Sequence, residues 1–251
     1  MAVRKAKIVT VTSVKGGVGK TTTVLNLAGI LSTFRKQVLI IDLDLYGSAV
    51  APALNLSYEN DIFTLINDLN NNRLDNINNY IIKYNDFIDV LPAPKDPRQA
   101  SKISSKYINV VLSRMSFKYD IILIDTNHVI DEINLVTLDA SDEILFVVTN
   151  DPIDLKNMRS MVSIFKDMDK KNYKIILNES INRQRDYFTK YDIKNIIEDN
   201  IDYTIPSDFY IKNIDKYVLN GEILVLNRKV SLTHKKAVNN FKLIVNAILK
   251  N

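Results

Sequence analysis

A short glycine-rich segment near the amino terminus has the residue types, in the order, that bind phosphate. From Lys15 to Thr21 the chain is Lys-Gly-Gly-Val-Gly-Lys-Thr, and three of its six glycines lie there. Glycines let backbone N–H groups approach phosphate oxygens, and the amino end of a following helix adds its dipole. Lys20 is then placed to reach the β- and γ-phosphates of a nucleotide, and the Thr21 hydroxyl to bind Mg²⁺. The alternative interpretation, a flexible glycine turn, does not explain why the segment ends in Gly-Lys-Thr.

Three aspartates at the ends of predicted strands point to the same site. Asp42 and Asp44 lie two residues apart at the end of the run that begins at Val38, and alternation along a strand sends both side chains to one side. Asp125 ends the apolar run that starts at Tyr119, which fits a Walker B strand whose acid holds Mg²⁺ through water. We therefore expect these acids at the carboxyl edge of a sheet, beside the phosphate-binding segment.

The phosphate-binding segment departs from the ordinary pattern at its start. That pattern has glycine where this chain has Val14, and here an additional lysine, Lys15, precedes the glycine pair. This form resembles the deviant Walker A motif of the MinD/ParA family of ATPases, and the resemblance runs across nearly the whole chain. It implies ATP and Mg²⁺ as cofactors and a homodimer with ATP at its interface. Lys15 would act on the phosphates bound by the other subunit, and Lys20 on those of its own.

The resemblance also assigns roles to the acids. Asp44 is the expected water-positioning catalytic residue, together with the two lysines. Thr21, Asp42 and Asp125 are the expected metal-site residues. Leu45 and Tyr46 replace the Pro-Gln pair common in the family, which leaves the geometry of this loop and the hydrolysis rate open.

Two later segments resemble the part of the family that holds the base. Asn178 ends the apolar run that starts at Ile175, and its amide carries both a donor and an acceptor for a purine edge. Pro206 and Asp208 lie in a segment similar to the loop that closes over adenine. Both patterns favour ATP over GTP. The complete set of expected nucleotide-binding residues is Lys15, Gly16, Gly17, Val18, Gly19, Lys20, Thr21, Thr22, Asn178, Pro206 and Asp208.

The elements that must position these residues alternate along the chain. Apolar runs predict strands at Lys7–Thr12, Val38–Leu43, Asp120–Asp125, Ile144–Thr149 and Lys174–Leu177. Amphipathic stretches predict helices at Lys20–Phe34, Pro97–Met115, Leu155–Met168, Phe188–Asp199 and Leu232–Leu249. The alternation predicts an α/β P-loop NTPase fold, a mostly parallel twisted sheet with helices on both faces. One MinD/ParA-like ATPase domain over residues 1–251 is the simplest division, with no receiver-like domain before it.

Composition narrows the functional class further. The chain has no cysteine, which excludes disulfides, thiol nucleophiles and the cluster-ligating cysteines of nitrogenase-reductase-like electron transfer. Its two histidines are too few for an ordinary histidine metal site. Lysine and arginine exceed aspartate and glutamate by 33 − 29 = 4, a mild excess that predicts no partner by itself. No apolar run is long enough for a transmembrane segment, so we expect a cytoplasmic protein, with peripheral attachment at the inner membrane face or cell pole as the alternative.

Different segments of the chain are similar to different branches of the family. The order of segments from Leu91 onwards looks similar to CpaE and TadZ, which position pilus-secretion machinery, and a later segment around Gly221 also looks similar to MinD. A protein partner from a localisation or secretion machinery is therefore expected. The alternatives are a ParA-like DNA partition ATPase and a nucleotide-binding scaffold without significant hydrolysis. A nonspecific DNA surface would use Lys166, Lys170, Lys171, Lys174, Arg183, Arg185, Arg228 and Lys229, although scattered lysines are more often a solvated face.

Overall fold

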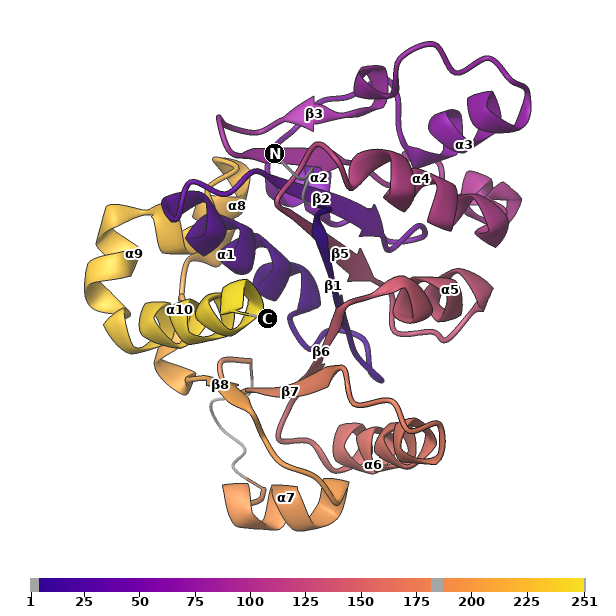
Figure 1. Cartoon of the computed structure of the whole chain (residues 1–251). Helices are drawn as coiled ribbons and strands as arrows, with labels where there is room; N and C mark the ends of the chain where they lie inside the picture. The colour runs from indigo at the N-terminus through magenta and orange to yellow at the C-terminus, as the bar shows by residue number, and fades with distance from the viewer. Residues whose placement is uncertain (1–4, 182–186, 251) are drawn as a thin grey trace.

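The sheet at the centre of the fold follows from the buried apolar runs. The structure is a computed structural model, and it describes residues 5–181 and 187–250. Within these residues eight strands form one sheet in the order β3-β4-β2-β5-β1-β6-β7-β8, parallel except for the edge pair of β3 with β4 (Figure 1). The strands are β1 (Lys7–Thr12), β2 (Val38–Leu43), β3 (Ile82–Lys83), β4 (Ile88–Leu91), β5 (Ile121–Thr126), β6 (Glu143–Val148), β7 (Tyr173–Asn178) and β8 (Tyr203–Ile205).

Helices cover both faces of this sheet. One face carries α1, α9 and α10, and the other carries α3, α4, α6 and α7 (Figure 1). The α-helices are α1 (Lys20–Thr33), α2 (Val50–Ala53), α3 (Ile62–Asn70), α4 (Ile108–Met115), α5 (Glu132–Ala140), α6 (Pro152–Asp167), α7 (Lys190–Ile197), α8 (Ile214–Leu219), α9 (Arg228–Thr233) and α10 (Lys235–Lys250). Among the described residues, no helix combines the length and the hydrophobicity needed to cross a bilayer.

Strand β2 shows why the predicted sheet forms. All six of its residues are buried, as a parallel strand covered on both faces requires. Leu39 and Ile41 face the core beneath α3 and α4, whereas Val38 and Ile40 face the core beneath α1 and α10. The alternation in β2 therefore contributes to both cores and holds the strand in register with β5.

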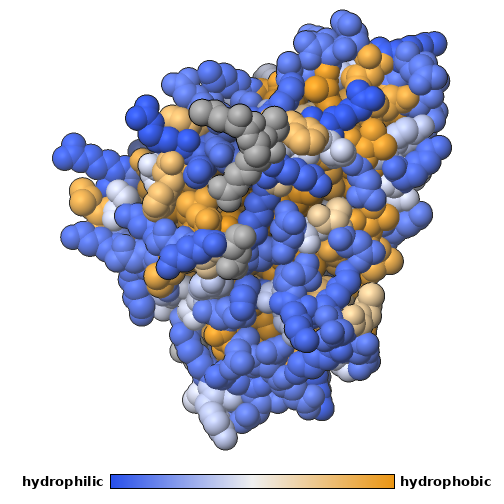
Figure 2. Space-filling view, viewed as in Figure 1, coloured by the Kyte–Doolittle hydropathy of each residue, from blue (hydrophilic) through white to orange (hydrophobic). Residues whose placement is uncertain are grey.

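Helix α10 is the last packing element of the fold. Its apolar residues Phe241, Ile244, Val245 and Ile248 are buried in the core shared with α1, while lysines and asparagines lie on the opposite side. In the direction of Figure 1, hydrophilic residues cover most of the visible surface, with hydrophobic residues between them (Figure 2). The predicted helix at Leu232–Leu249 is therefore confirmed, except that its first turn belongs to α9, which ends before His234.

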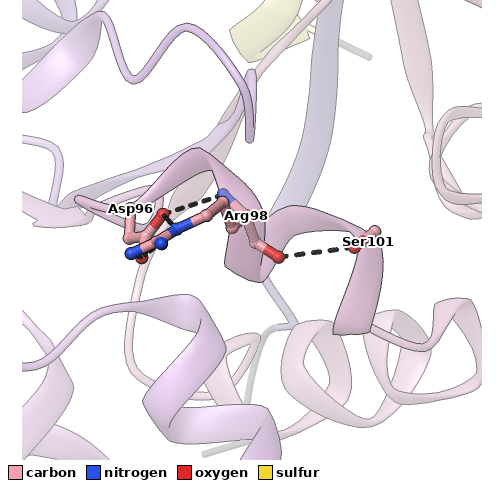
Figure 3. A network of polar contacts seen from close by, with 3 residues as sticks. All are labelled: Asp96, Arg98 and Ser101. Atoms are coloured by element: carbon pink, nitrogen blue, oxygen red, sulfur yellow. Dashed lines mark hydrogen bonds and ion pairs between the residues drawn. The ribbon is translucent and has the colours of Figure 1, made fainter.

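The predicted helix Pro97–Met115 is wrong as a single element. The chain forms two short 3₁₀ turns, Pro97–Lys102 and Ser105–Tyr107, before α4 begins at Ile108. The Asp96 carboxylate accepts from the Arg98 backbone N–H and pairs with its guanidinium, and the Ser101 hydroxyl donates to the Arg98 carbonyl (Figure 3). These local bonds favour a tight turn over a continuous helix, and the chain is extended again at Ile103.

Candidate functional site

The phosphate-binding loop lies where neighbouring connections of the sheet diverge. Strand β1 pairs with β5 on one side and with β6 on the other, and residues 13–19 connect β1 to α1 at their carboxyl edge. In parallel α/β sheets a ligand crevice forms outside the carboxyl ends of such strands. The predicted loop, the acids of β2 and β5 and the amide of β7 all lie at this edge, as the sequence indicates.

Two glycines give the loop its curvature. Gly17 and Gly19 have left-handed φ angles of 74° and 92°, which other residues adopt at a cost. A Cβ atom at Gly19 would also lie 2.6 Å from the side-chain nitrogen of Asn178. Glycine at position 19 is therefore required both by the backbone angle and by the close approach of β7.

Lys20 is held inside the loop. Its side chain is buried, and its ammonium group donates to the Ser13 hydroxyl at 3.1 Å. Ser13 in turn donates to the Lys15 carbonyl at 2.6 Å. Burial lowers the pKa of Lys20, and the nearby carboxylates of Asp125 and Asp44 oppose that shift. The ammonium is thus desolvated and directed into the loop, which is the arrangement that favours an anionic ligand.

The side chains of Thr21 and Asp125 are in contact, as expected of two residues of a magnesium site. The Thr21 hydroxyl donates to Oδ2 of Asp125 at 2.5 Å, and Oδ1 of Asp125 is buried without a hydrogen-bond partner among the described residues. Burial raises the pKa of Asp125 to about 7, although the bond from Thr21 and the charge of Lys20 act against the shift.

These donors fit Mg²⁺. An unpaired buried carboxylate oxygen beside a hydroxyl is the oxygen set this cation accepts, and nucleotide phosphates and water would supply its other ligands. No group of three acidic or histidine side chains able to hold a metal occurs in the part of the chain that the structure describes.

Asp42 lies beside Asp125 but is already engaged. The two residues are register partners on β2 and β5. Oδ1 of Asp42 accepts from the Asp44 N–H at 3.1 Å, and Oδ2 from the Val50 N–H at 3.0 Å. Burial and the neighbouring Asp125 raise the pKa of Asp42 well above its usual range. Asp42 thus fixes the connection from β2 to α2, and its contact with a cation stays a prediction.

Asp44 stands at the mouth of the same connection. Its side chain accepts from the Gly47 N–H at 3.2 Å, while its carbonyl accepts from the N–H groups of Gly47 and Ser48. The residue is half-buried, and its charge acts on Lys20. This tight turn holds the carboxylate close enough to the phosphate-binding loop for its charge to act on Lys20, and its role in positioning water stays a prediction.

Lys15 points away from its own loop and toward the start of α6. Its ammonium group lies 3.0 Å from Oδ1 of Asp151. Asp151 is the residue before α6 and also accepts from the N–H groups of Ile153 and Asp154. This partner was not predicted from the sequence, although an aspartate directly before a proline is a recognisable helix start.

Asn178 serves the loop in this structure. Its amide nitrogen donates to the Val18 carbonyl at 2.9 Å, and its oxygen accepts from the N–H and the hydroxyl of Ser180. Pro206 precedes a 3₁₀ turn at Ser207–Phe209, and Oδ1 of Asp208 is buried without a hydrogen-bond partner in the described residues. Asn178 therefore links β7 to the phosphate-binding loop, and Asp208 retains an acceptor for a ligand.

Comparison with known families agrees with this geometry. A family described as an AAA domain, AAA_31, matches residues 6–182. The chain belongs to the AAA_31 family. Among curated sequences, this AAA_31 protein is 32% identical over 151 residues to the sporulation initiation inhibitor protein Soj of Bacillus subtilis, covering 57% of this chain and 58% of Soj. It also spans 63% of the length of an uncharacterized protein of Pseudomonas putida.

Solved structures match the AAA_31 protein over nearly its whole length. A ParA family ATPase from Chlorobium tepidum has a TM-score of 0.80 at 22% identity, with 97% of this chain and 98% of that chain covered. The septum site-determining protein MinD of Pyrococcus horikoshii, complexed with Mg-ADP, has a TM-score of 0.77 at 20% identity, with 97% and 96% covered. These likenesses confirm the predicted α/β P-loop NTPase fold.

Proposed function

We propose that this protein is an ATPase switch that binds ATP with Mg²⁺, dimerises around the nucleotide and positions a cellular assembly. The observation that carries the proposal is the meeting of Thr21 with Asp125 beside the buried Lys20. The matched MinD structure contains Mg-ADP, and the matched curated relatives include a chromosome partitioning protein ParA and the sporulation initiation inhibitor protein Soj. A second lysine on the same loop, Lys15, is the feature that adds dimerisation to nucleotide binding.

Each residue of the site has its own role in the proposed reaction. Backbone N–H groups of residues 16–19 and the ammonium of Lys20 hold the phosphates, while Thr21 and Asp125 hold the cation. Bound Mg²⁺ supplies positive charge that stabilises the phosphoryl group as it is transferred. Asp44 orients the attacking water. The sequence identifies no arginine that would act on the transferred phosphoryl group, so we expect slow hydrolysis that a partner protein accelerates.

Exposed apolar side chains support a face-to-face dimer. Tyr46, Val129 and Ile130 lie on the connections that follow β2 and β5, and Ile153 lies in the first turn of α6, at the same sheet edge as the nucleotide site. Each exposes about half of its surface or more. Such residues around an ATP site are stabilised when a second copy covers them.

A further part of the proposal concerns the cellular surface, membrane or DNA, on which the switch acts. We favour CpaE/TadZ-like or MinD-like positioning in the cytoplasm or at the inner membrane face. Four lysines of the suggested DNA surface bond to their own chain: Lys166 to the Glu198 carbonyl, and Lys170, Lys171 and Lys174 to aspartates. Arg183 and Arg185 lie outside the described residues. DNA partition, which the name of the matched chromosome partitioning protein ParA of Myxococcus xanthus suggests, remains the second candidate.

The decisive experiment measures phosphate release and oligomeric state together. We expect slow ATP turnover and a monomer-to-dimer shift in light scattering with ATP but not with ADP. Lys20→Ala is the matched negative control, because it removes the phosphate-binding ammonium. ATP binding with no turnover, alone or with partners, would support the nonhydrolytic scaffold, and no nucleotide binding would overturn the proposal. Cosedimentation with anionic liposomes and with DNA, each with ADP and with ATP, identifies the surface.

A further inference from the structure

A histidine beside the phosphate-binding loop has no role in the site described above. His128 lies on the connection between β5 and α5, three positions after Asp125. A Cβ atom added to Gly16 would lie 3.3 Å from Cε1 and 3.4 Å from Nδ1 of His128, and the three nearest atoms all belong to this ring. The imidazole therefore packs directly on the loop that is built to hold phosphate.

The contact limits the space at residue 16. Gly17 and Gly19 have left-handed backbone angles, but Gly16 does not. A side chain at residue 16 would meet the imidazole, which would have to shift by a few tenths of an ångström. At Gly17, by contrast, an added Cβ atom would have no neighbour within 4 Å. Gly16 and His128 are thus complementary in shape.

The position of His128 is set by the backbone of its turn. The side-chain oxygen of Asn127 accepts from the Val129 N–H at 2.8 Å and from the Asn134 amide at 2.7 Å. Asp131 then caps α5 by accepting from the Asn134 N–H at 2.8 Å. These bonds hold the residues on both sides of His128, so the ring is presented to the loop by an ordered turn.

The ring nitrogens remain available. His128 is exposed, and no hydrogen bond joins its ring to another residue in the described part of the chain. An imidazole carries at least one N–H donor in either charge state, and phosphate oxygens are acceptors. We propose that His128 is a phosphate-contacting residue of the site, whose ring packs on Gly16 and donates an N–H to the bound phosphates. This inference rests on the proposed nucleotide-binding function.

The test uses the small number of histidines in the chain. With only His128 and His234 present, ¹³C-histidine-labelled protein gives two Cε1–H signals, which the His128→Gln variant assigns. Magnesium pyrophosphate is the probe, because it carries phosphates without the base. We expect it to shift the His128 signal and to leave His234, which packs on Phe209, in place.

The same titration separates the two proposals. A fluorescent ADP analogue bound to the protein reports occupancy of the site, and magnesium pyrophosphate should displace it. Full displacement with an unmoved His128 signal would overturn the inference while leaving the nucleotide site intact. If neither the analogue nor pyrophosphate binds, the proposed function fails, and the role of His128 fails with it.

Two variants distinguish hydrogen bonding from packing. His128→Phe keeps a ring on Gly16 but has no N–H, whereas His128→Gln keeps a donor. We expect His128→Phe to weaken pyrophosphate affinity on the order of tenfold, as loss of a hydrogen bond to a charged group does, and His128→Gln to weaken it less. Wild-type affinity in His128→Phe would overturn the proposal, and an unchanged melting curve confirms that the variant is folded.

Discussion

The ammonium group of Lys15 lies 3.0 Å from the carboxylate of Asp151, so the loop lysine is paired within its own subunit. Asp151 is at the same time the cap of α6, and the N–H of Asp154, followed by Lys15, lowers its pKa. A lysine proposed to act on the partner's nucleotide must leave this pair when the dimer forms. In the proposed dimer the Lys15–Asp151 pair would therefore oppose dimerisation, and ATP-dependent contacts would have to outweigh it.

Asp151→Asn should make dimerisation easier. Asparagine is as good a helix cap as aspartate, so α6 keeps its start while Lys15 loses its charged partner. Because partly exposed ion pairs contribute little, we expect an increase of about two- to fivefold in the ATP-dependent dimerisation constant. Analytical ultracentrifugation with a nonhydrolysable ATP analogue measures it. A weaker dimer in this variant would show that Asp151 supports the interface instead.

Lys15→Ala should separate dimerisation from nucleotide binding. Lys20, Thr21 and Asp125 stay in place, so affinity for ATP should change by less than about threefold, within the effect of one exposed charge. The ATP-dependent dimer, however, should disappear in light scattering. Lys83→Ala is the matched control, because Lys83 also pairs with an aspartate at 3.0 Å but lies on the edge strand β3. Unchanged dimerisation in Lys15→Ala would refute its role across the interface.

Asp44→Ala should retain ATP and trap the dimer. The carboxylate that orients water is lost, while the phosphate-binding loop and the Thr21–Asp125 pair remain. We expect phosphate release to fall by about two orders of magnitude, the usual contribution of one acid–base group. Single-turnover phosphate release measures the chemical step. Turnover at the wild-type rate would remove Asp44 from the mechanism.

The strands that carry the site were predictable because their pattern has few alternatives. For β1 and β2 the predicted bounds agree with the structure, since both are nearly continuous runs that a sheet must bury on both faces. The positions of Lys20 and Thr21 also followed from local order, because both lie in the first turn of α1 directly after the glycines. Local pattern and tertiary fold agree at these positions.

Other features depend on contacts between distant segments. Asn178 and Val18 are 160 positions apart, and nothing in either segment indicates that the amide would bond to the loop carbonyl. The segment from Pro97 to Met115 had helical spacing, but the bonds of Asp96 and Ser101 to Arg98 favour 3₁₀ turns. Hydrogen bonds from side chains to the backbone competed with helix formation in this segment. The hydrophobic periodicity of the sequence does not reveal such bonds.

Asp125 should make the stability of the nucleotide-free protein fall as pH rises. Its pKa is raised to about 7 by burial, so between about pH 4 and pH 7 the folded state keeps a proton that the unfolded state has lost. The free energy of unfolding then decreases with pH through this window. Denaturation in EDTA at pH 5 and pH 8 should show a loss on the order of 2 kcal/mol that Asp125→Asn reduces.

The control for this pH dependence is Asp86→Asn, which removes a carboxylate that is 86% exposed. Its curve should follow that of the wild type. Mg-ADP should also reduce the loss in the wild type, because a bound cation stabilises the charged form of Asp125. Equal pH dependence in Asp125→Asn and the wild type would show that the buried carboxylate does not control stability.

Gly221→Ala should destabilise the fold. Gly221 has a left-handed φ of 64°, and a Cβ atom there would lie 2.2 Å from the Leu54 carbonyl oxygen. The angle alone costs about 1–2 kcal/mol, and the backbone of the neighbouring segment would also have to move. Gly17→Ala is the matched control for urea denaturation, since its φ is 74° but an added Cβ atom meets nothing within 4 Å. Gly221→Ala should therefore lose more stability than Gly17→Ala, and equal losses would show that the segment around Leu54 yields without cost.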